Sequence, residues 1–407
     1  MNCRHCLNEL TYQWLDLGFA PPSNAYVSRE KLNAPELYFP LRLFVCEKCW
    51  LVQTEDYAKA NELFSGDYAY FSSISKSWLQ HAADYCSRIT HSLSLNESSF
   101  VIEVASNDGY LLKNMVSAKI PCLGIEPTDS TADAAESLGI PVLRDFFGET
   151  LAKSLANQGK QADLIIGNNV LAHVPDINDF VKGLKIALKP TGTITLEFPH
   201  LLQLIKSCQF DTVYHEHYSY LSLGTVRQIL SSVGLKVVDV DILQTHGGSL
   251  RVHACHKSDS REANNMVSKV LQEESLAGLQ SLSGFEGFQQ RAFSIKLDLL
   301  QFLVEQKKNG KRVAAYGAAA KGNTLLNYAG VGADLLPYVV DASVHKQGLF
   351  MPGSHIPIVS ESSIREQKPD FVLILPWNLK DEISTQLDYI KEWGGKFVIS
   401  MPEMRIL

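Results

Sequence analysis

The stretch DTVYHEHYSY, residues 211–220, places two histidines, one glutamate and three tyrosines close together. His215 and His217 are two positions apart, which puts them on opposite faces of a strand and about 200° apart on a helix. Zinc-protease helices space their histidines as H-E-x-x-H, so this pattern does not predict a metal site of that kind. Two interpretations remain. Tyr214, Glu216 and His217 perform acid/base chemistry, or the stretch is a polar loop without a chemical role.

The composition is typical of a globular protein with more than one domain. The chain has 407 residues, 45% of them hydrophobic and 20% charged, which is more than one ordinary core accommodates. A formal net charge of −7 argues against a surface for nucleic acid or anionic lipid. No apolar run is long enough to cross a bilayer, and the polar start MNCRHCLNEL lacks the apolar core of a signal peptide. We therefore expect a cytoplasmic protein without nucleic-acid or membrane partners.

Four of the eight cysteines form two C-x-x-C pairs, CRHC and CEKC. The cytosol keeps thiols reduced, so these pairs are not expected to be disulfides. Two such pairs supply four thiolates, the ligand set of closed tetrahedral zinc sites. The alternative is a redox pair, and His5 is a competing ligand. We expect one structural zinc ion, bound by Cys3, Cys6, Cys46 and Cys49.

Short apolar segments alternate with helical patterns along the middle of the chain. These segments are SFVIEV, CLGI, PVL, ADLIIGN, GTITLEF and GLKVVDVDIL. The alternation predicts a doubly wound α/β sheet, in which ligands bind past the carboxyl ends of the strands. Polar residues stand at those ends: Ala105–Gly109, Glu126, Asp145 and Asn168–His173. The sequence therefore predicts a polar crevice along one edge of the sheet.

A second α/β unit follows a helical segment. Residues 262–308 have apolar residues spaced by three and four, which predicts helices that connect two domains. The next stretch, KRVAAYGAAAKGNTLLNYA, combines a strand, a glycine-rich turn and a helix. Small residues let a ligand approach the backbone, and a helix N-terminus offers unpaired N–H groups to an anion. Lys321 adds a positive charge, and Asn323 and Thr324 add donors. The alternative is a tightly packed turn without a ligand.

The turn EVASNDGYLL, which follows the first apolar segment of the middle unit, indicates the cofactor. It has one glycine where the dinucleotide fingerprint has three, which leaves little room for a pyrophosphate. Glu126 can accept hydrogen bonds from both hydroxyls of a ribose. Glu103 and Asp108 would repel a diphosphate but attract a sulfonium and an amino group. The alternative is an incidental turn.

We therefore expect S-adenosylmethionine as the cofactor. The residues expected to bind it are Glu103, Ala105, Ser106, Asn107, Asp108, Gly109, Glu126, Pro127, Asp145, Phe146, Asn168 and Asn169.

Motifs spread over essentially the whole chain carry a family resemblance. In order they are CRHC and CEKC, IEVASNDGYLL, GIEPT, NNVLAHVPD, FDTVYHEHYSYLS, THGGSLRV, YGAAAKGNTLLNYAG, PWN and PEMRIL. In these the chain resembles the zinc-containing, S-adenosylmethionine-dependent 3-C-methyltransferases of nucleotide-linked deoxysugars. There are two departures. Ala105 stands where members usually carry glycine, which would tighten the cofactor site slightly. His215 stands where some relatives have aspartate, so we give it no catalytic role.

The resemblance implies an α/β fold with three domains. A Rossmann-like class I methyltransferase domain would be flanked by a small N-terminal zinc-binding domain and a second, C-terminal Rossmann-like α/β domain. We expect a monomer. The expected division is 1–72 for the zinc-binding domain, 73–258 for the methyltransferase domain, 259–308 for a helical connector and 309–407 for the C-terminal domain.

The resemblance also implies a reaction, methylation at carbon 3 of a dTDP-linked 4-keto-6-deoxysugar. A base removes the proton next to the ketone, and the resulting enolate attacks the methyl group of S-adenosylmethionine. His217 is the expected base, with Glu216 orienting or charging it. Tyr214 would donate to the enolate oxygen or relay its proton, and His173 is the other candidate base.

The substrate is expected to lie between the two α/β units, with its diphosphate on the glycine-rich turn. His246 is a weaker candidate, because its Gly-Gly turn can also be purely structural. Two other functions remain open. They are an NAD-dependent nucleotide-sugar oxidoreductase, with AAYGAAAKG as its cofactor turn, and a non-catalytic nucleotide-sugar-binding protein. The expected substrate-binding residues are Tyr70, His246, Gly247, Lys321, Asn323 and Thr324.

Overall fold

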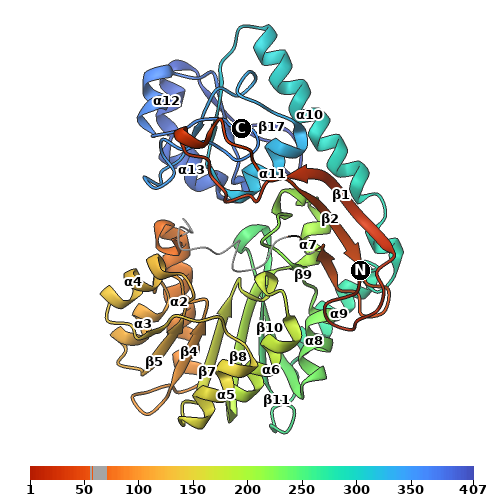
Figure 1. Ribbon diagram of the computed structural model, residues 1–407, viewed down its shortest axis with the longest axis vertical. Helices are drawn as coiled ribbons and strands as arrows, with labels where there is room; N and C mark the ends of the chain where they lie inside the picture. Colours follow the sequence, from red (N-terminus) through yellow and green to blue (C-terminus); the bar gives the residue numbers. More distant parts are fainter. Residues whose placement is uncertain (56, 58–70) are drawn as a thin grey trace.

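The computed structural model describes residues 1–55, 57 and 71–407. Its largest sheet, in the lower half of Figure 1, has seven strands in the order β10-β11-β8-β7-β4-β5-β6. Strands β6, β5, β4, β7 and β8 are parallel, whereas β11 pairs antiparallel with both β8 and β10. The predicted doubly wound sheet is therefore confirmed. The strands are β4 (Val101–Val104), β5 (Cys122–Ile125), β6 (Val142–Leu143), β7 (Ala162–Asn168), β8 (Leu188–Pro199), β10 (Leu235–Leu243) and β11 (Ser249–His256).

Helices cover this sheet, and side-chain caps fix where several of them begin. Ser75, Asp176 and Ser222 each accept a backbone N–H of the helix that follows, at 3.3, 2.9 and 3.1 Å. These bonds satisfy donors that have no partner within the helix. Among the described residues, no helix is long and apolar enough to cross a membrane. The helices are α2 (Lys76–Ser92), α3 (Leu112–Ser117), α4 (Asp129–Ser137), α5 (Glu149–Asn157), α6 (Ile177–Ala187), α7 (Leu201–Lys206), α8 (Leu223–Ser232) and α9 (Asn265–Leu276).

The N-terminal residues form a four-stranded antiparallel sheet with the order β1-β2-β3-β9. Its last strand comes from far along the chain, and Val52 pairs with Tyr220 while Gln53 pairs with Ser219. Since β9 belongs to the stretch DTVYHEHYSY, this pairing holds that stretch beside the N-terminal sheet. The strands are β1 (Tyr12–Ala20), β2 (Phe39–Val45), β3 (Val52–Thr54) and β9 (Ser219–Tyr220).

The second α/β unit, in the upper half of Figure 1, contains a six-stranded sheet with the order β14-β13-β12-β15-β16-β17. Its strands are parallel except β17, so the expected second sheet is confirmed. The strands are β12 (Val313–Tyr316), β13 (Val339–Val340), β14 (Ile358–Val359), β15 (Phe371–Ile374), β16 (Lys396–Ile399) and β17 (Arg405–Ile406). The helices are α11 (Ala320–Ala329), α12 (Ser362–Gln367) and α13 (Lys380–Gln386).

Short 3-10 turns connect many of these elements. Two of them, η4 and η7, lie beside the candidate site. The 3-10 turns of the described residues are η1 (Arg29–Lys31), η2 (Ser72–Ile74), η3 (Leu171–His173), η4 (Phe210–Thr212), η5 (Thr245–Gly247), η6 (Leu282–Phe285), η7 (Trp377–Leu379) and η8 (Asp388–Trp393).

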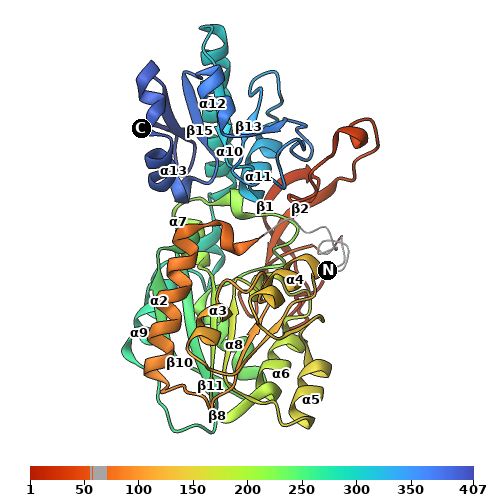
Figure 2. The same cartoon turned by 90° about the vertical axis from the view of Figure 1, so that its left-hand side faces the viewer.

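One hydrophobic core joins the N-terminal sheet to the C-terminal unit. The long helix α10 (Phe288–Lys308) packs against β1, α11 and β12, whereas α9 packs against β10. Trp14 of β1 lies 4.5 Å from Phe288, ring centre to ring centre, and donates to the Phe285 carbonyl at 2.8 Å. Figure 2 shows the residues between β1 and β2 extending along the C-terminal unit, where Val27 forms an isolated bridge with Phe350. The helical segment therefore contacts all three sheets.

Candidate functional site

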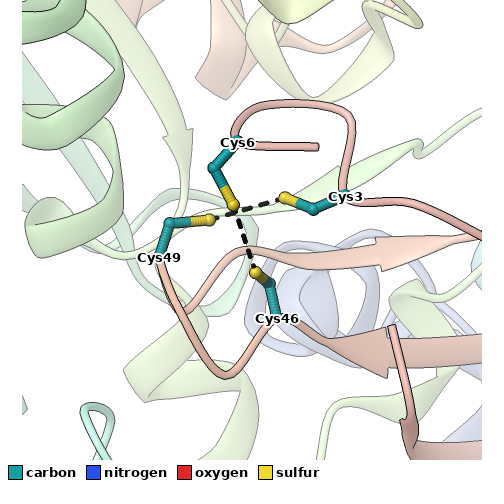
Figure 3. Close-up of side chains that lie close together, drawn as sticks. All are labelled: Cys3, Cys6, Cys46 and Cys49. Carbon is teal, nitrogen blue, oxygen red and sulfur yellow. Dashed lines mark hydrogen bonds between the residues drawn. The ribbon is translucent and has the colours of Figure 1, made fainter. Parts of the chain in front are cut away.

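The four cysteines of the two pairs converge on one point (Figure 3). Their Sγ atoms all lie within 4.8 Å of one another, with Cys3 3.5 Å from Cys49 and Cys6 3.4 Å from Cys46. Zinc–sulfur bonds of about 2.3 Å in a tetrahedron require sulfur atoms about 3.8 Å apart. The arrangement therefore fits one zinc ion.

Both cysteine pairs use the same backbone turn. Leu7 and Trp50, directly after the second cysteine of each pair, have φ of 61° and 62°, and each donates its N–H to the carbonyl of the first cysteine. A side chain in this left-handed region is strained, so the turn needs a compensating interaction such as metal ligation. His5 bonds Asn178 through Nδ1 at 2.8 Å, so this nitrogen is directed away from the sulfur atoms.

Buried polar groups gather at the carboxyl ends of β4 and β7. Within the described ranges, no hydrogen-bond partner reaches the carboxylate of Glu103, the hydroxyl of Ser106, Oδ1 of Asp108 or the side-chain amide of Asn168. Burial, followed by the charges of Glu126 and Asp108, raises the pKa of Glu103 well above its usual value. Unpaired buried polar groups are costly, and a ligand carrying a positive charge and an amino group would satisfy them. The site therefore fits S-adenosylmethionine.

The turn after β4 is tied to its neighbours by hydrogen bonds. Asn107 donates its backbone N–H to Glu126 Oε2 at 2.9 Å, and its side chain accepts from the backbone of Ser72 at the same distance. Thr128 donates to Glu126 Oε1 at 3.0 Å. Each carboxylate oxygen of Glu126 keeps lone-pair capacity for a ribose hydroxyl. Ala105 adopts φ of 56°, a region that favours glycine, so an alanine is strained at this position.

The remaining cofactor candidates lie just after the ends of β5, β6 and β7. Pro127 directly follows Glu126, and Asp145 and Phe146 follow β6, where 48% of Phe146 is exposed. Asn169 lies beside His246, with 3.2 Å between Nδ2 and Nε2. The structure thus brings these candidates to one edge of the seven-stranded sheet, at the ends of β5, β6 and β7.

His217 is held by two hydrogen bonds that define its chemical form. Its Nδ1 lies 2.9 Å from the carbonyl of Thr212, and its Nε2 lies 2.8 Å from the hydroxyl of Tyr214. Because a carbonyl oxygen only accepts, Nδ1 carries the hydrogen and Nε2 of the neutral ring accepts from Tyr214. Burial, together with the charge that His173 would carry, lowers the pKa of His217 well below its usual value. The ring is therefore neutral at physiological pH.

His173 stands beside His217 at the end of η3. The ring centres are 4.6 Å apart, and His173 Nδ1 donates to the Glu216 carbonyl at 2.8 Å. Burial lowers the pKa of His173 to about 4. Tyr214, His217 and His173 therefore form one cluster, as the sequence led us to expect for residues of a common crevice.

Glu216 does not lie where we expected. Both ring nitrogens of His217 are occupied by other groups, and Glu216 Oε1 instead accepts from the side chain of Asn24 at 3.1 Å. The peptide group of Glu216 therefore faces His173, while its side chain faces the N-terminal residues. Its orienting role for His217 is taken by the Thr212 carbonyl.

The C-terminal candidates divide into two kinds. Lys321 is directed toward η7, since its ammonium donates to Asn378 Oδ1 at 3.0 Å and lies 5.0 Å from the ring centre of Trp377. Asn323 and Thr324 are buried, and they donate to the carbonyls of Ser23 and Val213 at 2.6 and 2.8 Å. Their donors are thus used within the protein. Tyr70 lies outside the described residues.

Sequence reasoning missed three residues of this region. Asp211 is the first residue of the opening stretch, and Trp377 lies in the PWN motif, yet neither received a role. Trp377 Nε1 donates to Asp211 Oδ2 at 2.7 Å. Burial raises the pKa of Asp211 to about 6, although the charge of Lys321 opposes this shift. Trp78 of α2 was also missed, and its ring lies 5.1 Å from that of His246.

Comparison with known proteins agrees with this geometry. Family models match residues 3–64 as a zinc binding domain, 78–240 as a methyltransferase domain and 244–402 as a C-methyltransferase C-terminal domain. The C-methyltransferase NovU of Streptomyces niveus is 32% identical over 408 residues, which is 100% of this chain and 96% of the relative. The chain belongs to the C-methyltransferase family. It is an S-adenosylmethionine-dependent enzyme with a structural zinc site, so the oxidoreductase and non-catalytic alternatives are rejected.

More distant similarities cover only parts of the chain. A ubiquinone biosynthesis O-methyltransferase of Bartonella tribocorum is 26% identical over 98 residues, which is 23% of this chain and 38% of the relative. The crystal structure of the PH0226 protein from Pyrococcus horikoshii aligns with a TM-score of 0.39 at 12% identity, over 49% of this C-methyltransferase and 100% of that protein.

We predict that replacing Cys46 by serine removes the zinc ion and lowers the thermal unfolding midpoint. Structural zinc sites contribute directly to folding, with binding free energies of about 10 kcal/mol or more. Metal analysis should find one zinc per wild-type chain and much less in Cys46→Ser. Cys122→Ala, which changes a cysteine outside the cluster, should keep its zinc. A wild-type protein purified without zinc would contradict the prediction.

We predict that the His173 and His217 rings stay neutral at pH 5.5. Burial penalises the charged form, so protonation requires a lower pH than the usual value of about 6.5. Nuclear magnetic resonance of ¹⁵N-labelled histidines should show no titration of either ring between pH 7.5 and pH 5.5, and His173→Asn and His217→Asn assign the signals. The denatured protein should titrate near pH 6.5. A folded-state midpoint near 6.5 for either ring would show that burial does not control it.

Proposed function

We propose that this C-methyltransferase acts on carbon 3 of a 4-keto-6-deoxysugar linked to a nucleotide, with dTDP as the nucleotide. The observation that carries the proposal is the hydrogen-bonded pair of Tyr214 and neutral His217, with His173 beside it. Methylation at carbon requires a base that removes a proton next to a ketone, and this pair is suited to that step. The motifs of the family resemblance support the nucleotide-linked sugar.

Tyr214 and His217 form a proton relay in the proposed mechanism. Tyr214 donates its hydroxyl hydrogen to Nε2 of His217, and its phenol oxygen is the proposed acceptor of the proton from the substrate carbon. As the phenol oxygen takes that proton, its own hydrogen moves to Nε2 in the same step, so Tyr214 stays a neutral phenol and the ring becomes an imidazolium. Burial disfavours that charge in the resting protein, but the enolate that forms beside it is negative and compensates it. His173 adds a second ring to the same side of the site.

Glu103, Glu126, Asn107 and Asn168 are the proposed ligands of S-adenosylmethionine. When bound, this cofactor supplies a methyl group on a positively charged sulfur. Glu103 would accept from the amino group of the cofactor. The carboxylates of Glu103 and Glu126 would stabilise the positive charge of its sulfur. Glu126 would accept from the ribose through the lone pairs that its backbone partners leave unused.

Lys321 is the proposed contact to the diphosphate of the nucleotide. It stands at the start of α11, where the first N–H groups of the helix also favour an anion. Burial lowers its pKa, and a diphosphate beside it would restore the charged form. Because Asn323 and Thr324 donate to backbone carbonyls, the proposal rests on Lys321. Tyr70, His246 and Gly247 remain proposed as part of the sugar site.

We further propose a cytoplasmic monomer with the division 1–72, 73–258, 259–308 and 309–407. The sheets support this division in part, because the zinc segment, the seven-stranded sheet and the C-terminal sheet each occupy one unit. Strand β9 is the exception, since it belongs by sequence to the second unit and pairs with the first.

We predict that His217→Asn and Tyr214→Phe reduce kcat far more than they weaken binding of either substrate. Acid/base groups contribute about a hundred- to ten-thousand-fold in rate, and both variants interrupt the relay. Steady-state kinetics with the keto-sugar nucleotide would measure the effect. His256→Asn and Tyr389→Phe, which lie away from this cluster, are matched controls. Near-normal turnover in both test variants would move the base to His173.

We predict that Lys321→Ala raises the KM for the sugar nucleotide and leaves the affinity for S-adenosylmethionine unchanged. The variant removes the cation beside the proposed diphosphate, whereas the cofactor site lies on the seven-stranded sheet. Titration calorimetry with S-adenosylhomocysteine and with the nucleotide diphosphate would separate the two. Lys311→Ala, at an exposed ion pair with Asp370 of the same unit, is the control. Loss of cofactor binding alone would mean that the two α/β units are assigned the wrong way round.

A further inference from the structure

Two side chains of the C-terminal unit bind the turn η4 and the residue after it, at the start of the loop 210–218 that carries Tyr214 and His217. Trp377 Nε1 donates to Asp211 Oδ2 at 2.7 Å, and Thr324 Oγ1 donates to the Val213 carbonyl at 2.8 Å. Asp211 and Val213 stand on either side of Thr212, and 1%, 0% and 4% of these three residues is exposed, respectively. The C-terminal unit therefore binds the residues on both sides of Thr212, through the side chain of Asp211 and the backbone carbonyl of Val213.

Thr212 determines which nitrogen of His217 carries the hydrogen. Its carbonyl accepts from Nδ1 at 2.9 Å, which leaves Nε2 as the acceptor for the Tyr214 hydroxyl. If this carbonyl moved away, the other tautomer would become accessible. In that form Nε2 carries the hydrogen and cannot accept from Tyr214. Loss of the correct tautomer is costly in related catalytic arrangements, in which a histidine accepts a proton through Nε2.

We propose that Trp377 and Thr324 are positioning residues, which fix the Thr212 carbonyl and thereby hold His217 in the form with hydrogen on Nδ1. This inference rests on the acid/base role proposed above for Tyr214 and His217. It assigns a positioning role to Thr324 and to Trp377 of the PWN motif.

Contacts around the indole also fix Trp377. A Cβ atom on Gly247, which has φ of 87°, would lie 2.5 Å from Cη2 of the ring, so only glycine fits at this position. The Lys321 ammonium lies 5.0 Å from the ring centre, a favourable distance for a cation beside an aromatic ring. The hydrogen bond to Asp211 is therefore made by a ring that is itself packed.

The first test compares Trp377→Phe and Thr324→Val with matched changes elsewhere in the C-terminal unit. The controls are Trp393→Phe, whose indole donates to the Pro369 carbonyl at 3.0 Å, and Thr385→Val, whose hydroxyl donates to the Asp381 carbonyl at 2.8 Å. We expect kcat to fall about ten- to a hundredfold in the two test variants, because a small displacement of a catalytic group costs this much. The KM for S-adenosylmethionine and the kcat of both controls should stay unchanged. Equal kcat in test and control variants overturns the inference.

The second test reads the tautomer directly and needs no substrate. In ¹⁵N-histidine spectra of the full chain, wild-type His217 should show hydrogen on Nδ1, and His217→Asn identifies the signal. Trp377→Phe and Thr324→Val should both shift this signal toward the average of the two tautomers. An unchanged signal in both variants overturns the inference. If the wild type methylates no nucleotide-linked keto-sugar, the proposed function fails, and these spectra still decide the inference.

Two variants of Asp211 test the same hydrogen bond from its acceptor side, so the test does not depend on correct folding of Trp377→Phe. Asp211→Asn keeps an oxygen that can accept from the indole, whereas Asp211→Leu removes it. We expect Asp211→Asn to retain more kcat and more of the wild-type His217 signal than Asp211→Leu. Equal losses in the two variants contradict a role for this hydrogen bond.

Discussion

The arrangement of the site depends on the pairing of β9 with β3. This pairing continues into the catalytic loop, where Thr54 donates its backbone N–H to the Tyr218 carbonyl at 3.2 Å and its hydroxyl to the His217 carbonyl at 3.3 Å. Strand β3 begins at Val52, three residues after Cys49 of the second cysteine pair. The side chain of Gln53 in β3 accepts the backbone N–H of Arg4, which lies within the first pair, at 2.8 Å. The zinc cluster therefore lies next to the strand that holds the His217 carbonyl, so a metal without a chemical role is connected to the position of the proposed base.

Burial acts in opposite directions on the ionisable groups of the site. At the cofactor end it raises the pKa of Glu103, and at the catalytic end it lowers the pKa of His173 to about 4 and raises that of Asp211 to about 6. A lowered histidine pKa contributes stability that is present above about pH 6.5 and is lost as the pH falls toward 4. The raised carboxyl pKa of Asp211 contributes stability that is present below about pH 4 and is lost as the pH rises through 6. Between about pH 4 and pH 6 these two contributions therefore depend on pH with opposite signs.

The sequence predicted those parts of the molecule that follow from local patterns. Apolar segments became strands, the spacing of the cysteines identified the zinc cluster, and polar residues at strand ends such as Glu103 and Asn168 came together at one edge. Contacts between distant segments could not be predicted in this way. The side chain of Glu216 turned toward Asn24, and Thr324 was used to bind the Val213 carbonyl. Donor types read from a sequence show what a side chain can do, but its partner is decided by which segments fold next to it.

The loop 210–218, which carries the proposed base His217, contacts elements of all three sheet units. Parallel strands place the cofactor residues at the ends of β4, β5 and β7, on a rigid edge. The loop 210–218 leaves that edge, so β3 supports it on one side while α11 and η7 support it on the other. The core shared by β1, α10 and β12 fixes these supports relative to each other. The position of the proposed base His217 is therefore set by contacts with all three sheets, whereas the ends of the parallel strands alone position the proposed cofactor residues.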